Sequence, residues 1–381
     1  MQENNNFQEF NNQENSLIND DTEQNVTDVY ENHQENYNGQ GNRDNSEPLV
    51  KQYVPIFVPL NTETPEEKEK KAIKKTAMLI GLSCLIMTGI TYFWGTAYFA
   101  LMKAFGIDTS EAYKIANDPF VLQFLQIIIS TIMFIPSFMV VFKIGGYSIS
   151  RIVSFLKPEK GTVIPIILIG AGFCSFANVS VYIAGSVFSS LGIEYSVDRA
   201  EDPNGILGFI ISFIATAIVP ALVEEFACRG IILGSLRKFG DGFAIIVSSV
   251  IFGLIHGNFE QIPFAFLIGL ILGFVTVKTG SIWLACAIHS LNNAVSVIFG
   301  YLSQLADSNI QGLVYNIYSA LSLIVGIIGI YLLAKRKEDT FKLSGAQTQA
   351  SEAKKHKWFF TQPVIIILTV ICLIESISYF F

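Results

Sequence analysis

The sequence lacks the short motifs that mark several large classes of enzyme. It contains no P-loop, no GxGxxG and no HExxH, so it carries no signature of a nucleotide site, a dinucleotide site or a helix-borne zinc protease. It also has no repeat of solenoid period and no basic patch that would bind nucleic acid. The five cysteines lie in apolar runs without a CxxC pair, which predicts buried structural thiols rather than disulfides or thiolate metal sites.

Charge is scarce as well. Only 15% of the 381 residues are charged, 51% are hydrophobic and the mean hydropathy is +0.46, which is more apolar than a soluble domain of this size. Runs close to the roughly 20 apolar residues that cross a bilayer predict an all-α, polytopic membrane bundle of eight or nine helices. These runs fall at about 77–102, 120–142, 163–191, 205–236, 243–256, 262–277, 282–301, 312–334 and 362–381.

The N-terminal region has a different composition. Its first fifty residues hold thirteen Asn, eleven Asp plus Glu and one basic residue, Arg43. Such a segment cannot bury enough apolar surface to offset its chain entropy, so residues 1–60 are expected to form a disordered acidic tail. The net charge of −7 therefore hides a slightly basic membrane region. That region divides into N-terminal helices at 77–204, a core at 205–301 and C-terminal helices at 312–381.

The basic residues between the runs predict the orientation. No signal peptide is recognisable, so the first span is expected to be an anchor. If the N-terminus is cytoplasmic and nine runs cross, nineteen Lys and Arg fall on the inner side and three, Lys103, Lys114 and Arg199, on the outer side. Short basic loops stay in the cytoplasm. The sequence thus predicts an integral protein of a bacterial cell membrane, in contact with lipid, with a cytoplasmic N-terminus.

Three short segments inside the apolar runs carry ionisable and amide side chains. They are Glu224-Glu225 with Arg229, Phe252 with His256, and His289 with Asn292 and Asn293. An ionisable group costs about 2.5–3.5 kcal/mol at membrane depth and therefore marks a functional site by default. The alternative is a buried ion network that only holds helices together.

The spacing of the first segment predicts a division of labour. Glu225 and Arg229 are four residues apart and share a helix face, so they are expected to form a salt bridge, whereas Glu224 is rotated away. A free carboxylate in a poorly solvated pocket is a suitable general base. We therefore expect Glu224 to be the base and Glu225 with Arg229 to support it.

Helix lengths predict which groups can meet. Glu225 precedes the turn at Gly240 by fifteen residues and His256 follows it by sixteen, which places both about 20 Å along antiparallel helices. His289 lies nine residues beyond a turn near Gly280 and is therefore about 7–10 Å shallower. A tilt or a break in a helix has to supply the difference.

Two chemistries fit this set of residues. His289 and Asn293, four apart, with Asn292 beside them, are suitable hydrogen-bond donors for an oxyanion. Alternatively Glu224, His256 and His289 make up the two-histidine, one-carboxylate set of a hydrolytic zinc site. The sequence leaves open whether a metal or a directly activated water performs the reaction, so the cofactor is open as well.

Other residues in the apolar runs are given smaller roles. Cys228 is a weak candidate nucleophile among apolar neighbours, and Glu375 in the last run is expected to pair with a polar neighbour. Phe252 is expected to fix the rotamer of His256 by packing. Gly269 and Gly273 form a GxxxG, which indicates close contact between helices.

The ordered segments EEFACRG, FGLIH and HSLNN resemble the EExxxR, FxxxH and HxxxN motifs of the CAAX protease and bacteriocin-processing (CPBP, or Abi) family. The resemblance covers roughly residues 205–301. It implies that Glu224 and His256 activate water, that Glu225 and Arg229 support them, and that His289 and Asn293 donate to the oxyanion. Members of this family are often labelled metalloproteases, and a metal-free glutamate mechanism has also been argued for them.

The resemblance also implies a class of substrate. Eukaryotic members process prenylated CAAX proteins, and bacterial members are associated with peptide maturation, bacteriocin immunity or sensor regulation. We therefore expect a type II CAAX-protease-like intramembrane endopeptidase that hydrolyses a membrane-associated or lipidated peptide and does not bind nucleic acid. The alternative is a non-catalytic scaffold or immunity factor, or an ion-coupled transporter.

Overall fold

The described part of the chain is helical. The computed structural model describes residues 63–192, 202–305, 307–336, 342, 343, 345 and 348–380. The tail predicted for residues 1–60 and most of the acidic loop 192–204 lie outside them. The described residues contain no β-strand, only one isolated antiparallel bridge between Phe155 and Ser281. The predicted all-α class is confirmed.

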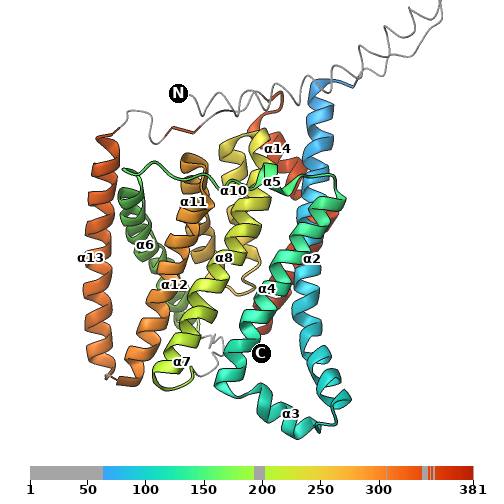
Figure 1. Ribbon diagram of the computed structural model, residues 1–381. Coiled ribbons are helices and arrows are strands. Elements are labelled where there is room, and N and C mark those ends of the chain that lie inside the picture. Colours follow the sequence, from blue (N-terminus) through green and yellow to red (C-terminus); the bar gives the residue numbers. More distant parts are fainter. Residues whose placement is uncertain are drawn as a thin grey trace, which may run out of the picture. The chain divides into compact units, whose positions relative to one another are not determined.

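Figure 1 shows the arrangement of the helices. In chain order they are α2 (Pro65–Ala104), α3 (Thr109–Ala116), α4 (Pro119–Ile144), α5 (Ile149–Ile152), α6 (Val163–Ser190), α7 (Gly205–Ser212), α8 (Val219–Glu225), α9 (Gly234–Leu236), α10 (Asp241–Leu254), α11 (Gln261–Thr279), α12 (Ile282–Leu305), α13 (Ser308–Ala334), α14 (Glu352–Phe360) and α15 (Pro363–Ser378). The segments α7 to α9 belong to one continuous rod, Gly205–Phe239.

Polar residues between the apolar runs set the ends of several helices. Thr64 and Glu67 form a capping box at the start of α2, in which each side chain satisfies a backbone amide that the helix leaves without a partner. Asp118 caps α4, whose first residue is Pro119, and Asp307 caps α13. Each cap stabilises its helix by about 1 kcal/mol, so the boundaries are encoded locally.

The apolar helices lie where the sequence predicts them, and one is short. Among the described residues seven helices are long and apolar enough to cross a membrane, and an eighth counts if α14 and α15, bent by 69°, form one span. The predicted run 243–256 is helical, but α10 has only 14 residues, about 21 Å. Because the hydrocarbon core is about 30 Å thick, α10 alone does not cross it.

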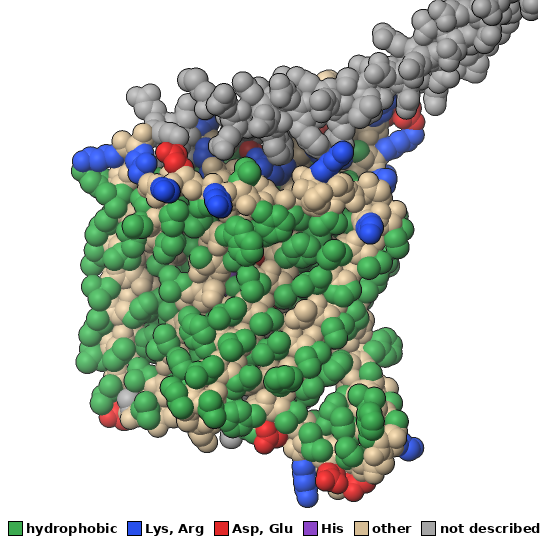
Figure 2. Space-filling model, viewed as in Figure 1, with side chains coloured by type: hydrophobic (Ala, Val, Ile, Leu, Met, Phe, Trp, Pro, Cys, Tyr) green, Lys and Arg blue, Asp and Glu red, His purple; other side chains and the backbone are tan. Residues whose placement is uncertain are grey.

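The surface is that of a membrane protein. On the face shown in Figure 2 apolar side chains cover the middle of the molecule, most Lys and Arg lie along the upper rim, and the lower end carries acidic side chains with a few basic ones. The exposed apolar residues include Ile324 and Ile327 on α13 and Ile367 on α15. This band agrees with an integral membrane protein. The cytoplasmic position of the N-terminus stays a prediction.

A hairpin of α10 and α11 packs beside the Gly205–Phe239 rod and positions much of the site. A methyl group at Gly269 would lie 2.9 Å from Cα of Ser249, and one at Gly273 would lie 3.3 Å from Ile245. Only glycine permits this approach, so the predicted close helix contact is confirmed.

The two predicted turns that set the depth of the site are both present. Gly240 has φ 124° before α10, and Gly280 has φ 65° after α11, conformations that favour glycine. The first turn is held by the buried side chain of Lys355 on α14, whose Nζ donates to the carbonyl of Phe239 at 2.7 Å. The C-terminal helices therefore help to fix the start of α10.

Candidate active site

The rod that carries the glutamates is not a regular α-helix. It widens to π-helical geometry at Phe213–Ile218 and again at Phe226–Leu233, on either side of α8, and such segments are frequent at functional sites. Pro220 explains part of this, because it has no amide hydrogen for the carbonyl of Thr216. The side chain of Asn293 donates to that carbonyl instead, at 3.1 Å.

The last two residues of α8 are Glu224 and Glu225, and Glu225 points into a dry part of the protein. Its side chain is 0% exposed, and Oε1 accepts from Arg229 Nη1 at 2.9 Å and from His289 Nδ1 at 2.8 Å. The predicted salt bridge is present, and the histidine that the depth arithmetic placed too shallow is bonded to it. Glu225 thus joins the rod to α12.

Arg229 is enclosed on its other sides. Nη2 donates to the carbonyl of Gly269 at 3.4 Å, and the guanidinium carbon lies 4.3 Å from the centre of the Phe252 ring. Arg229 is 1% exposed, so its charge is balanced by Glu225 and the aromatic face rather than by water. The guanidinium is part of the wall of the site and does not reach into open space.

Glu224 differs from its neighbour in exposure and in the contacts that its carboxylate makes. Its side chain is 17% exposed, and its nearest printed partner is His289, with 3.9 Å between Oε2 and Nε2. That distance is too long for a hydrogen bond, and Oε2 has no hydrogen-bond partner among the described residues. A water molecule can bind both atoms, because two hydrogen bonds of about 2.8 Å span separations up to about 5.6 Å.

His256 lies just beyond the end of α10, in the turn that leads to α11, and not within a helix as predicted. Its Nδ1 donates to the carbonyl of Phe252 at 2.7 Å, and its ring meets the Phe252 ring edge-on at 4.9 Å. The packing role predicted for Phe252 is thereby confirmed. Because Nδ1 carries the hydrogen, Nε2 has a free lone pair.

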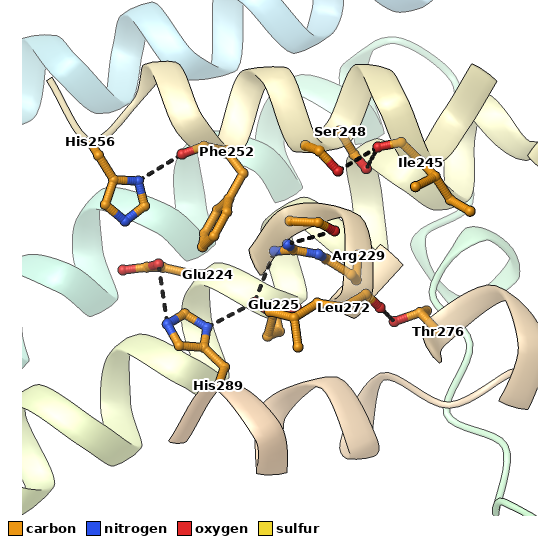
Figure 3. Close-up of polar contacts among 12 residues, drawn as sticks. Glu224, Glu225, Arg229, Ile245, Ser248, Phe252, His256, Leu272, Thr276 and His289 are labelled. Atoms are coloured by element: carbon orange, nitrogen blue, oxygen red, sulfur yellow. Dashed lines mark hydrogen bonds and ion pairs between the residues drawn. The ribbon is translucent and has the colours of Figure 1, made fainter. Parts of the chain in front are cut away.

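Figure 3 shows how these groups converge: the carboxylate of Glu224 lies between the rings of His256 and His289. The ring of Phe252 also meets His289 edge-on, at 5.8 Å. A single aromatic ring thus touches both imidazoles and the guanidinium. The first two motif segments and the histidine of the third are brought together.

A cavity of about 170 Å³ borders this group on one side. It is lined by Glu224 and His256 and, from helices that the motifs do not include, by Tyr92 on α2 and Glu375 on α15. The remaining lining is mostly Met, Thr and Phe from α2 and α4. Glu225 and Arg229 do not line it. Cys228 is fully buried and also lies outside the lining, so its position gives the thiol no access to a substrate.

The fit of a metal can be judged from the donors. In both histidines Nδ1 is engaged and Nε2 is directed to Glu224 or the cavity, an arrangement that metal-binding imidazoles share. Among the described residues, however, no three His, Cys, Asp or Glu side chains are grouped closely enough to hold a metal ion. The set Glu224, His256 and His289 therefore does not fit a metal in this arrangement, and we derive no step through one.

Sequence reasoning expected Glu375 to pair with a polar neighbour but did not identify that neighbour as Tyr92. Glu375 is hydrogen-bonded to the hydroxyl of Tyr92, a polar neighbour of the kind predicted. An acidic residue in an apolar run was the available signal. Nothing in the spacing of α2 and α15 indicates that they meet at the site.

Comparison with known proteins agrees with the motif segments. Residues 206–295 match the family described as "Type II CAAX prenyl endopeptidase Rce1-like", and this range includes all three segments. This match supports the resemblance of residues 206–295 to the CPBP family. The CPBP match covers the rod from α7 onward, the α10–α11 hairpin and the part of α12 that carries His289 and Asn293. It leaves α2, α4, α13 and α15 outside.

Two curated relatives extend the CPBP comparison. The chain is 34% identical over 137 residues to the putative membrane peptidase YdiL of Bacillus subtilis (strain 168), which is 34% of this chain and 53% of YdiL. It is 28% identical over 161 residues to the membrane-embedded CAAX protease MroQ of Staphylococcus aureus (strain USA300), which is 39% of this chain and 62% of MroQ. The chain thus spans little more than half the length of these relatives. No solved structure matches it.

Proposed function

We propose that this chain is an intramembrane endopeptidase in which Glu224 activates a water molecule against a peptide bond. One observation carries the proposal: of two adjacent carboxylates, Glu225 is dry and salt-bridged to Arg229, whereas Glu224 has no salt bridge to any Lys or Arg that the structure describes and borders the cavity between two imidazoles. A structural ion network needs no such surplus acid. A general base needs it.

His256 orients the water in this proposal. Its Nδ1 hydrogen is committed to Phe252, so Nε2 can only accept a hydrogen bond while the ring is neutral. A water that donates one hydrogen to Nε2 and the other to Glu224 turns an oxygen lone pair toward the cavity. Attack on the carbonyl carbon transfers that second proton to Glu224, which delivers it to the leaving nitrogen as the C–N bond breaks.

His289 stabilises the oxyanion. Its Nδ1 hydrogen is held by Glu225, so Nε2 carries a hydrogen only in the doubly protonated ring. In that form the net charge of the site is zero, because the two carboxylates are balanced by two cations, Arg229 and His289. A neutral group of this kind suits a site enclosed by apolar helices. A charged donor of this kind bonds more strongly to developing negative charge than a neutral one.

The substrate follows from where the cavity lies. It is bordered by three of the apolar helices, α2, α4 and α15, so a peptide reaches it within or beside the membrane. We propose a membrane-associated or lipidated peptide. The names of YdiL and MroQ, a putative membrane peptidase and a membrane-embedded CAAX protease, support this class. Processing of a bacteriocin or another secreted peptide falls within it.

The test compares membrane peptides from cells that carry the native chain, Glu224→Ala or Glu111→Ala. Glu111 is an exposed acid on α3 and serves as the matched control. We expect uncut precursors to accumulate with Glu224→Ala alone, and the purified native chain to cut them between defined residues. Identical peptide sets in all three strains, with equal amounts of inserted protein, would favour the scaffold or transporter instead.

A further inference from the structure

We propose that Glu375 is a specificity-determining residue, which binds a Lys or Arg side chain of the substrate peptide within the catalytic cavity. The inference rests on the proposed peptidase function and concerns what the site selects. Glu375 lies on α15, outside the family match at 206–295. The selectivity is therefore a property of this chain's own C-terminal helix rather than of the matched core.

The first observation behind this inference is the position of Glu375. It lines the same cavity as Glu224 and His256. It also abuts the turn that holds the catalytic histidine, because a methyl group at Gly257 would lie 2.7 Å from Oε2 of Glu375. Gly257 follows His256 directly and has φ 63°. A group bound to Glu375 is therefore held next to the water-activating pair.

The second observation is the charge of the residues that line the cavity. Its ten lining residues include two acids, Glu224 and Glu375, and one histidine, but no Lys or Arg. Arg229, the nearest cation of the motif segments, is committed to Glu225 and to Gly269 behind the Phe252 ring. A carboxylate among apolar helices is stabilised by an opposite charge, and beside Glu375 the described lining offers hydroxyl groups and one imidazole but no Lys or Arg.

The polar groups around Glu375 suit a cation. Tyr92 donates to the carboxylate and fixes its direction, and the hydroxyls of Thr88 and Thr91 line the same wall of α2. An ammonium group has three N–H donors and a guanidinium group has five, so either can bond to the carboxylate and to a neighbouring hydroxyl oxygen as well. The volume of about 170 Å³ equals roughly six water molecules, which accommodates one long side chain but no lipid chain.

Glu375 does not serve the reaction itself in this proposal. Glu224 already supplies the general base, and His256 already accepts a hydrogen bond from the water. Its effect should appear in the choice of peptide and in KM rather than in the chemical step. A residue that only held α15 against α2 would affect all peptides alike.

The experiment uses the full chain purified in detergent and a set of peptides derived from one cleaved sequence. Each position near the cut carries Lys, Gln or Glu in turn, and kcat/KM is measured for the native chain, Glu375→Gln and Glu375→Lys. The native chain should prefer Lys at one position. Glu375→Gln should lose about 10–100-fold on that peptide, mainly through KM, with the Gln peptide unchanged. Glu375→Lys should prefer the Glu peptide.

Two controls separate selectivity from structure. Tyr92→Phe keeps the carboxylate and removes the bond that orients it, so the Lys preference should fall by less than about tenfold. Glu260→Gln removes an acid in the same turn, outside the cavity lining, and should change no preference. Equal losses on Lys, Gln and Glu peptides in Glu375→Gln would overturn the inference and leave the peptidase function intact. A native chain that cuts no peptide would overturn both.

Discussion

Glu224 and Glu225 are adjacent, but their side chains enter different surroundings. We call these the sealed side, around Glu225, which is closed to solvent, and the open side, around Glu224, which borders the cavity. On one side Glu225, Arg229 and His289 share short hydrogen bonds and side-chain exposures between 0% and 7%. On the other side three residues border a cavity: Glu224, His256 and Glu375. The contact of Glu224 with His289, at 3.9 Å, is too long for a hydrogen bond. We therefore expect adjacent residues of one type to have different roles: the sealed side to hold the site in shape, and the open side to contact the substrate.

The largest effect is expected on the open side. Glu224→Gln keeps the size of the side chain and removes the base, so turnover should fall by about 10²–10⁴-fold while the unfolding temperature in detergent stays near that of the native chain. Turnover on an identified peptide and thermal unfolding are the two measurements. Substantial turnover with normal stability would remove the central assignment.

Substitutions on the sealed side are expected to lower the free energy of unfolding. Glu225→Gln leaves the charge of Arg229 uncompensated in a site without solvent, which is expected to cost about 3–5 kcal/mol in the free energy of unfolding. The double variant Glu225→Gln with Arg229→Met should recover most of that loss, because the guanidinium that lacked a counter-charge is removed as well.

A matched pair of the same spacing lies at the end of the same rod. Arg237 Nε and Asp241 Oδ1 are 3.0 Å apart, with the arginine side chain 21% exposed. The Asp241 side chain is 7% exposed. Arg237→Gln should cost less than Glu225→Gln, because water still reaches the partly exposed arginine end of this pair. If breaking either pair lowers the free energy of unfolding by the same amount, water reaches the Glu225–Arg229 pair, and the proposed difference between the sealed and open sides is wrong.

His289 touches both sides, and its replacement tests oxyanion stabilisation against metal binding. His289→Ala should lower turnover by about 10²–10³-fold with little change in KM, and His289→Asn should keep part of the activity because an amide also donates. Metal content per chain should be measured with activity before and after chelation. Full turnover in metal-free protein supports the hydrogen-bond role, and loss of one tightly held zinc together with activity supports metal binding.

The smallest effect is expected at Asn293. Its Nδ2 already donates to the carbonyl of Thr216, and its oxygen accepts from Asn292, so the predicted oxyanion role competes with an anchoring one. Loss of one such hydrogen bond is worth about 0.5–1.5 kcal/mol, so Asn293→Ala should reduce turnover by at most about tenfold. A hundredfold loss without lower stability would favour direct donation to the oxyanion.

Local features of the sequence predicted a large part of this molecule. Apolar runs located the helices, because a span must satisfy its backbone within itself and cover itself with apolar side chains. The i, i+4 spacing predicted the bond of Arg229 to Glu225, and glycine predicted the turns at Gly240 and Gly280. Each of these depends on neighbours along the chain, so the residues alone suffice.

Other features were decided only by tertiary packing. The depth arithmetic assumed regular helices, whereas π-helical segments around Pro220 shift the register, and His289 reaches Glu225 after all. The shortness of α10 puts His256 in a turn, and the contact of α15 with α2 brings Glu375 to the cavity. The sequence by itself determined which groups carry charge into the membrane. Packing of distant helices decided which of them stay dry and which face a substrate, because burial depends on neighbours that sequence spacing does not specify.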